Sequence, residues 1–259
     1  NYFNTSISKK ILKKYGKAKV ITATNVFAHI DDINKLIKNI LRILKNDGIF
    51  ITESHYFLSL IETLQYDTIY HEHLRYYTLT SLKKIFQKYK LKIIFAKKIG
   101  THGGSIRVYA TREKKKTTNK NVLSLLKTEK KKINSKSIKK FKDGVVRSKI
   151  ELISLIKKIK KNKIIFGVGA PSRATTLVNY VGLDSNIIKY ICEVKGSHKI
   201  GHYLPGTKIP IVDEKIIFQS KPDYLILFSW HISKELIKIF KKKGYKGKFI
   251  IPLPKPKII

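Results

Sequence analysis

The sequence lacks methionine altogether and contains a single cysteine, Cys192, among its 259 residues. A chain without methionine does not begin at a start codon, and we therefore interpret this sequence as a fragment of a longer protein. One cysteine excludes both an internal disulfide framework and a cysteine zinc site within the chain. A reducing cytoplasm is the simplest location that fits this composition.

Long apolar runs are also missing. No stretch approaches the roughly 20 residues that a membrane span needs, and the longest, such as 224–230, suits a buried strand. Residues 1–16 are polar and basic, without the apolar segment of a signal peptide. We expect no membrane partner. With 42% hydrophobic residues, the chain can form one large or two small domains.

Acidic residues are scarce: 17 Asp and Glu oppose 55 Lys and Arg, which gives a net charge of +38. Basic patches can bind nucleic acid by releasing counterions from phosphates. Here the lysines fall on expected solvent faces of helices, as in 157–163, and do not alternate with aromatic residues that could stack on bases. We interpret the charge as compositional bias and expect no nucleic-acid partner, although a basic surface would attract phosphorylated substrates.

The first half of the chain alternates between strand and helix patterns. Strands are predicted at 18–23, 49–53, 91–96 and 105–111, with helices at 6–16, 31–46, 58–64 and 80–89. Such alternation predicts a parallel, doubly wound α/β sheet, whose last strand is antiparallel because only a short turn precedes it. No strand with a glycine-rich turn comes before residue 18, which supports the interpretation as a fragment.

A second α/β unit follows a lysine-rich connection and a long amphipathic helix at 137–161. Its strands are predicted at 163–166, 187–192, 224–228 and 248–251, with helices at 172–181 and 232–243. We therefore predict a first domain at 1–112, a helical connection at 113–162 and a second domain at 163–259.

The densest cluster of reactive side chains is YDTIYHEH at 66–73, with two histidines, two carboxylates and two tyrosines. A histidine can act as a general base, and a second histidine or a tyrosine can donate a hydrogen bond to a developing oxyanion. A carboxylate can orient the basic imidazole. A metal site is the alternative, since His71 and His73 have a ligand spacing, but no third strong ligand lies nearby in the sequence. We predict no metal in this chain.

Three further positions could bind a ligand. His29 and Asn25 follow the carboxyl end of the strand at 18–23, where open α/β sheets bind ligands, although His29 alone also fits a helix entry. The GVGA turn at 167–170 joins a strand to a helix, a typical anion site that Arg173 could support, yet a tight turn without ligand fits equally. The THGGS turn at 101–105, taken alone, indicates only a hairpin.

Five segments, in this order and spacing, resemble the bacterial S-adenosylmethionine-dependent deoxysugar C-methyltransferases. They are NVFAHIDD, YDTIYHEHLRYY, THGGSIRVYA, GVGAPSRATTLVNYVG and YLPGTKIPIVDE. The resemblance implies methylation of a nucleotide-linked keto-sugar, such as a dTDP-sugar, in antibiotic or surface-polysaccharide pathways. It also implies the C-terminal part of a Rossmann-like class I methyltransferase sheet, followed by a second Rossmann-like domain that helps to hold the sugar nucleotide. The family's zinc-binding domain would lie before Asn1.

The same resemblance implies roles for individual residues. His73 corresponds to the base, with Tyr70, Glu72 and His29 as its catalytic partners. Cofactor contacts are expected from Asn25, Val26 and Phe27. Substrate contacts are expected from two turns: His102, Gly103, Gly104, Ser105, Gly167, Gly169, Ala170 and Arg173. The stretch 192–195 departs from the Asp-containing loop usual in the family.

We predict that the fragment alone, without the family's glycine-rich cofactor loop, is inactive. Two other classes of function remain open. One is a catalytically silent module that only binds a nucleotide-sugar, and the other is a basic nucleic-acid-binding protein.

Overall fold

The structure of this chain is a computed structural model, which describes residues 2–159 and 162–259. The chain divides into two compact units. The first unit comprises Asn1–Glu62 and His71–Ile138, and the second comprises Thr63–Tyr70 and Lys139–Ile259. These units follow compactness alone, so the domain boundaries expected after residues 112 and 162 stay a prediction.

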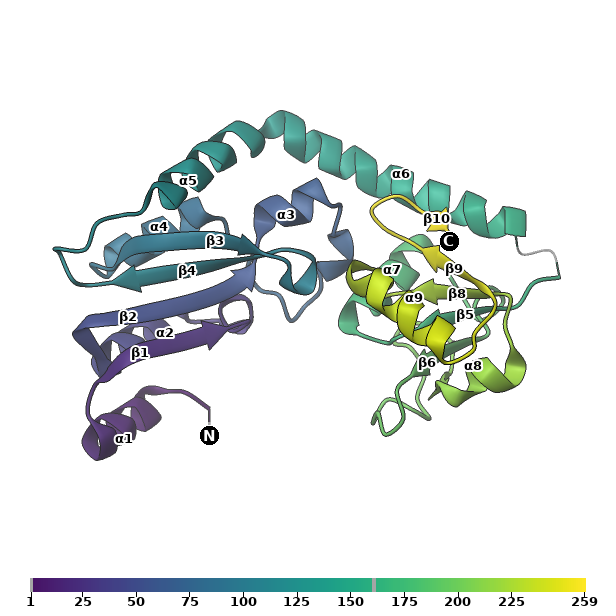
Figure 1. Cartoon of the computed structure of the whole chain (residues 1–259), viewed down its shortest axis with the longest axis horizontal. Helices are drawn as coiled ribbons and strands as arrows, with labels where there is room; N and C mark the ends of the chain where they lie inside the picture. Colours follow the sequence, from purple (N-terminus) through teal and green to yellow (C-terminus); the bar gives the residue numbers. More distant parts are fainter. Residues whose placement is uncertain (1, 160–161) are drawn as a thin grey trace. The chain divides into compact units, whose positions relative to one another are not determined.

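The first unit is built on a four-stranded sheet with the order β1-β2-β4-β3 (Figure 1). Its strands are β1 (Ala18–Thr24), β2 (Leu44–His55), β3 (Lys92–Ile99) and β4 (Ser105–Thr111). β1 runs parallel to β2, whereas β4 is antiparallel to both of its neighbours. The antiparallel hairpin predicted at the end of this half is therefore confirmed.

Five α-helices and three short 3-10 turns accompany these strands along the chain. The helices are α1 (Thr5–Tyr15), α2 (Ile33–Ile43), α3 (Phe57–Glu62), α4 (Leu79–Lys88) and α5 (Lys120–Lys132). The turns are η1 (Phe27–His29), η2 (Tyr66–Thr68) and η3 (Thr101–Gly103), of which η2 belongs to the second unit. Fully buried rings of Phe27, Phe50 and Phe86 lie in the core of the first unit.

The helix expected at 31–46 is shorter than predicted. The Asp32 side chain caps its start by accepting from Lys35 N, but the helix already ends at Ile43. Leu44 pairs with Ala18 of β1 and begins a twelve-residue strand, which includes Gly48. The predicted end of the helix was wrong because the backbone from Leu44 onward pairs with β1 as a strand, although the sequence pattern up to residue 46 favours a helix. A Cβ on Gly48 would also lie 3.0 Å from Lys19 O of the neighbouring strand.

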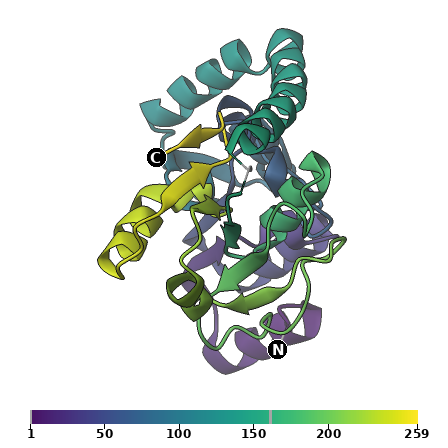
Figure 2. The same cartoon turned by 90° about the vertical axis from the view of Figure 1, so that its right-hand side faces the viewer.

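The second unit, whose C-terminal part is green to yellow in Figure 2, contains a six-stranded sheet. The strand order is β10-β9-β8-β5-β6-β7. Its strands are β5 (Ile165–Val168), β6 (Tyr190–Glu193), β7 (Ile211–Asp213), β8 (Tyr224–Leu227), β9 (Lys248–Ile251) and β10 (Lys257–Ile258). β5 to β9 are parallel, and β10 pairs antiparallel with β9. The mixed α/β fold predicted from the alternation of elements is confirmed in both units.

Three helices of the second half were expected and one was not. The expected ones are α6 (Ser135–Ile159), which begins in the first unit, α7 (Ser172–Val181) and α9 (Ser233–Lys242), with the short turn η4 (Trp230–Ile232) before α9; α8 (Lys215–Ser220) was not predicted. The predicted end of the long helix at 160–161 lies outside the described residues. On α6, Leu152 and Ile156 are buried while Lys157 and Lys158 are exposed, as its amphipathic pattern predicts.

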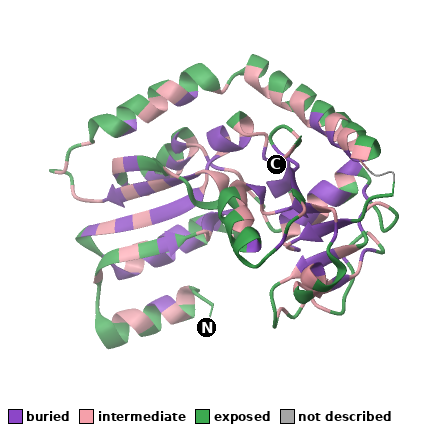
Figure 3. Ribbon diagram, turned by 45° about the vertical axis from the view of Figure 1, so that its right-hand side comes forward, coloured by how far each residue is buried: buried purple, intermediate pink, exposed green. Residues whose placement is uncertain are grey.

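Burial follows the position of each strand in its sheet (Figure 3): the inner strands β4, β5 and β8 are largely buried, whereas the edge strands β1 and β3 are mostly exposed or half-buried, and helices alternate between buried and exposed positions. Within residues 2–159 and 162–259, no helix is both long and apolar enough to cross a membrane.

Candidate active site

The segment after β1 forms one wall of a polar site. Asn25 adopts a left-handed backbone with φ of 54°, and its N–H donates to the carbonyl of Glu53 at 2.9 Å. Its side-chain Nδ2 lies 2.9 Å from Nε2 of His102 in the THGGS turn. Two of the expected ligand-binding residues, far apart in the sequence, are thus brought together at the carboxyl end of the strand.

Phe27 has a different environment from that expected of a cofactor contact. Its ring is fully buried and stacks on Phe50 at a centroid distance of 5.8 Å, with Phe86 edge-on. Val26 is half-buried and packs against the same core. The side chain of Phe27 therefore belongs to the core, and the expected cofactor contact, which stays a prediction, would have to come from its backbone.

The histidine loop is tied to the segment after β1 by backbone hydrogen bonds. Leu74 N donates to Ala28 O at 2.9 Å, and Nδ1 of His29 lies 2.9 Å from the carbonyl oxygen of Glu72. Because a carbonyl oxygen can only accept, Nδ1 carries the proton in this bond. The rings of His29 and His73 lie 5.0 Å apart. The structure thus places two of the expected catalytic residues side by side.

The other expected residues of this motif differ in their exposure. His71 and Glu72 are exposed, whereas His73 is half-buried. Glu72 contributes its backbone carbonyl to the contact with His29. Tyr70 is half-buried and belongs to the second unit, so its part in catalysis stays a prediction.

A third histidine, His55, was not expected at this site. It is the last residue of β2, and its ring lies 6.3 Å from that of His73, while the ring of Tyr76 lies 6.0 Å from that of His73. The strand predicted at 49–53 ended two residues short of His55. A longer strand would have revealed that His55, like His29, follows the carboxyl end of a strand at the same sheet edge.

A buried carboxylate connects β2 to the THGGS turn. Glu53 is 4% exposed, and its Oε2 accepts from Arg107 Nε at 3.0 Å and from a terminal guanidinium nitrogen at 2.8 Å. Its Oε1 accepts from Thr101 Oγ1 at 2.8 Å. This pair compensates the buried charge and fixes the start of the turn that carries His102.

The glycines of that turn are required by its geometry. His102, Gly103 and Gly104 have positive φ angles of 53°, 85° and 130°, and a Cβ on Gly104 would lie 2.5 Å from Cβ of Ser59. Ser105 is fully buried and donates to Thr101 O at 3.1 Å. Gly104 and Ser105 therefore shape the turn, His102 is exposed, and the substrate contacts expected from His102, Gly103, Gly104 and Ser105 stay a prediction.

The glycine turn of the second unit is closed by its own protein partners. Gly169 has φ of 81° and its N–H donates to Cys192 O at 2.9 Å. Ala170 N donates to Glu193 Oε1 at 2.6 Å, and Lys199 Nζ donates to Ala170 O at 2.8 Å. Glu193 lies in the stretch that departs from the family pattern. A phosphate at this turn would have to displace Glu193 from the Ala170 amide, and the substrate contact stays a prediction.

Gly167 is a packing residue within β5. A Cβ at this position would lie 2.5 Å from the ring of Phe228 and 3.0 Å from Ile191 Cγ1. We expect Gly167→Ala to destabilise the second unit by about 1–3 kcal/mol through overpacking. The measurement is urea unfolding, with Gly100→Ala as the control, because Gly100 has φ of −79° and no atom within 4 Å of an added Cβ. Equal stability of both variants would contradict the packing role.

Arg173 is committed to buried partners. It is 7% exposed, and its Nε and a terminal nitrogen donate to Asp67 at 2.7 and 3.0 Å. Its NH1 lies 2.8 Å from Nδ1 of His231, and its guanidinium lies 5.1 Å from the ring of Trp230. A diphosphate contact would require Arg173 to exchange these partners, so the expected substrate role stays a prediction.

Two cavities of the second unit lie at different places relative to the glycine turn at 167–170. One of about 280 Å³ adjoins it and is lined by Ala170, Ser172, Thr175, His198, Lys199, His202, Tyr203, Leu204, Pro205 and Ile211. Another, of about 760 Å³, lies at the amino ends of β8 and β9 and includes five lysines: Lys163, Lys221, Lys243, Lys246 and Lys248. It contains none of the expected site residues. Two of its lysines are paired with carboxylates, Lys163 with Asp223 and Lys243 with Glu214.

Among the described residues, no group of three or more His, Cys, Asp or Glu side chains is arranged to hold a metal ion. His29 and His55 lie near the carboxyl ends of the parallel strands β1 and β2, and their rings are 5.0 and 6.3 Å from that of His73.

Comparison with known proteins gives the class to which this fold and site belong. A family model described as the C-methyltransferase C-terminal domain matches residues 100–254, more than half of the chain, and a methyltransferase domain model matches residues 3–95. The chain belongs to the C-methyltransferase family. A curated relative, the C-methyltransferase NovU of Streptomyces niveus, is 30% identical over 267 residues, which cover 99% of this chain. The chain spans 62% of the length of that relative.

Proposed function

We propose that this protein transfers a methyl group from S-adenosylmethionine to the carbon next to the ketone of a nucleotide-linked deoxysugar. The observation that carries the proposal is the pairing of the His29 and His73 rings, 5.0 Å apart at the carboxyl end of β1, in a chain of the C-methyltransferase family. C-methylation next to a ketone requires a base for a weakly acidic proton and a donor for the enolate oxygen. Two neighbouring imidazoles can divide these tasks.

His73 is the base in this proposal. It is half-buried, and its backbone segment is fixed by the hydrogen bond from Leu74 N to Ala28 O. Its neutral imidazole takes the proton from the carbon next to the ketone, which leaves an enolate on the sugar. Exposed His71 in the same motif lacks a comparable position beside His29.

His29 steadies the enolate oxygen. Its Nδ1–H is committed to the carbonyl oxygen of Glu72, so only Nε2 can face the substrate. Nε2 donates a hydrogen bond only when the ring is an imidazolium, because a neutral ring carries one proton. In this proposal His29 is the hydrogen-bond donor and His73 the proton acceptor, so the donor lies where negative charge develops.

The end of β1 suits the cofactor in one respect. Asn25 is half-buried, with left-handed backbone, at the sheet edge where open α/β sheets bind ligands. Once bound, S-adenosylmethionine supplies a methyl group that its sulfonium charge already activates. Asn25 and the backbone of Val26 and Phe27 would hold it from this side. The expected inactivity of the chain alone stays a prediction, which a cofactor titration of this chain tests.

The proposed substrate is anionic, and the net charge of +38 favours its approach. Within the second unit, taken by itself, the start of α7 is the proposed contact for the phosphates of a sugar nucleotide. Three cationic or ionisable groups support this choice, since His198, Lys199 and His202 line the cavity that adjoins the Gly169 turn. Nucleic acid and membrane are not part of the proposal.

The proposal is tested by deuterium exchange in ²H₂O, using the protein expressed from its complete reading frame with S-adenosylhomocysteine present. We expect exchange at the carbon next to the ketone in a dTDP-keto-sugar. When S-adenosylmethionine replaces S-adenosylhomocysteine, we expect transfer of the methyl group to that carbon. Binding of the nucleotide-sugar without exchange across a panel of keto-sugars would overturn it in favour of a catalytically silent binding module.

A further inference from the structure

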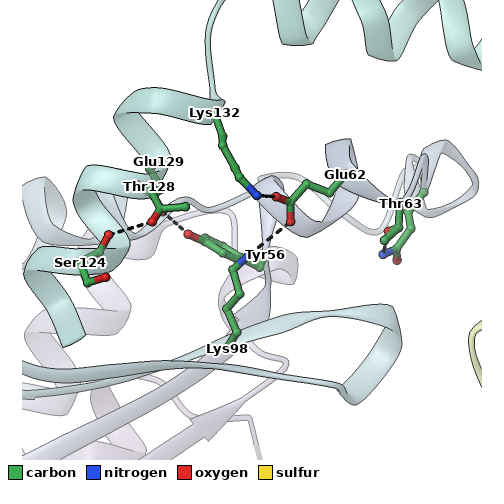
Figure 4. A network of polar contacts seen from close by, with 9 residues as sticks. Tyr56, Glu62, Thr63, Lys98, Ser124, Thr128, Glu129 and Lys132 are labelled. Atoms are coloured by element: carbon green, nitrogen blue, oxygen red, sulfur yellow. Dashed lines mark hydrogen bonds and ion pairs between the residues drawn. The ribbon is translucent and has the colours of Figure 1, made fainter.

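Glu129 is a buried carboxylate that none of the preceding steps uses. It lies on α5, is 2% exposed, and accepts four hydrogen bonds in a network that Figure 4 shows in part. A buried carboxylate is costly unless it is well compensated, and four donors provide that compensation. The segments to which these donors belong indicate what Glu129 does in the fold.

Three of the four donors lie at the start of α4. Oε1 accepts from Leu79 N at 2.5 Å, and Oε2 accepts from Thr80 N at 2.8 Å and Thr80 Oγ1 at 2.5 Å. α4 already has its own capping box, in which Thr78 and Ser81 bond reciprocally. Glu129 thus adds a second anchor to a helix start that is already capped, and this start directly follows the loop that carries His73.

The fourth donor connects two other site segments. Tyr56 Oη donates to Glu129 Oε1 at 2.8 Å, and Tyr56 immediately follows His55. Tyr56 N donates to Gly104 O at 3.1 Å in the turn that carries His102, and Tyr56 forms a bridge with Tyr77 at the end of the histidine loop. Burial, together with the nearby carboxylate, raises the pKa of Tyr56, so the phenol remains a donor at all working pH values.

We propose that Glu129 is a positioning residue that sets the placement of His73 relative to His29 and His55. The proposal rests on the proposed function of this site. Glu129, directly and through Tyr56, ties together the three segments that carry His55, His73 and His102, and its four donors are two backbone N–H groups, the Thr80 hydroxyl and the Tyr56 phenol. Misplacing a general base by about 1 Å can cost about 100-fold in rate.

The test compares Glu129→Gln with Glu62→Gln. Glutamine at 129 can still accept on one side, but its NH₂ group would face the Thr80 N–H, so at least one anchor is lost. Glu62 is a matched control in the same view (Figure 4): it is an exposed carboxylate whose partners are Lys98, at 3.3 Å, and Lys132. Burial alone would raise the pKa of Glu62, but these ion pairs lower it.

We expect Glu129→Gln to lower kcat for exchange at least tenfold with KM within twofold of the wild type, while Glu62→Gln changes neither. Tyr56→Phe removes one of the four donors and should give a smaller loss of kcat. Glu129→Gln enzyme that melts earlier but turns over at the wild-type kcat when folded would overturn the proposal and leave Glu129 a purely structural role.

A second measurement does not depend on activity. In ¹H–¹³C spectra of the histidine rings, Glu129→Gln should shift or broaden the His73 and His55 resonances and leave those of His198 and His202 in the second unit unchanged. Unchanged His73 and His55 resonances would overturn the positioning role. If the wild type shows no exchange with any keto-sugar, the proposed function fails, and the ring spectra still decide the question for Glu129.

Discussion

His73→Ala is expected to lower the rate of proton exchange next to the sugar ketone by about 10²- to 10⁴-fold, the usual contribution of a positioned general base. The remaining enzyme keeps His29 and its hydrogen bond to the Glu72 carbonyl, because that contact uses the backbone. The affinity for S-adenosylmethionine should stay within about twofold, since no expected cofactor contact involves His73. Exchange followed by NMR and cofactor titration by calorimetry measure the two quantities.

His71→Ala is the matched control for this prediction. His71 belongs to the same motif and is exposed, and it should retain nearly full exchange. Comparable losses in both variants would contradict the assignment of the base. A loss of cofactor affinity in His73→Ala together with the loss of exchange would instead indicate that His73 supports the loop structure.

His29→Ala separates the two imidazoles further. In the proposed mechanism His29 donates to the enolate oxygen, so its removal slows exchange but leaves a base in place. Added imidazole should restore exchange to His73→Ala but not to His29→Ala. This difference would support the division of roles between the two histidines.

Much of the fold could be predicted from local patterns. The strands at 105–111 and 248–251 and the helix at 172–181 have the predicted bounds, because hydrophobic periodicity and flanking turn residues agree at these positions. β7, α8 and β10 were missed, and they contain only three, six and two residues. Segments this short carry too few residues for a period to be recognised.

The site was predictable where its residues follow strand ends and unpredictable where partners are remote. His29 and Asn25 could be located because they follow a recognisable strand, and His55 was missed when its strand was predicted too short. Glu129 bonds to Leu79 across 50 positions, and Arg173 bonds to Asp67 across 106. No local pattern identifies such pairs, because the fold alone brings them together.

The second large effect is expected from Asp67, which lies within the YDTIYHEH motif at 66–73. It is 1% exposed and accepts from Arg173 and from Trp230 Nε1 at 2.8 Å. Asp67→Ala leaves a buried guanidinium without its counter-charge, and breaking such a pair costs about 3–5 kcal/mol. Chemical denaturation of the second unit, followed by the fluorescence of Trp230, measures this loss.

Glu214→Gln is the control in the same unit, since its ion pair with Lys243 is partly exposed and should contribute no more than about 1 kcal/mol. A loss in Asp67→Ala no larger than in this control would contradict the buried-pair argument. The double variant Asp67→Leu with Arg173→Leu adds a sharper test, because removing both charges should recover most of the lost stability. If the double variant recovers stability but loses nucleotide-sugar binding, Arg173 also contacts the substrate. If it recovers both, the Arg173 pair serves the fold alone, and the phosphates must be held by other groups near the Gly169 turn.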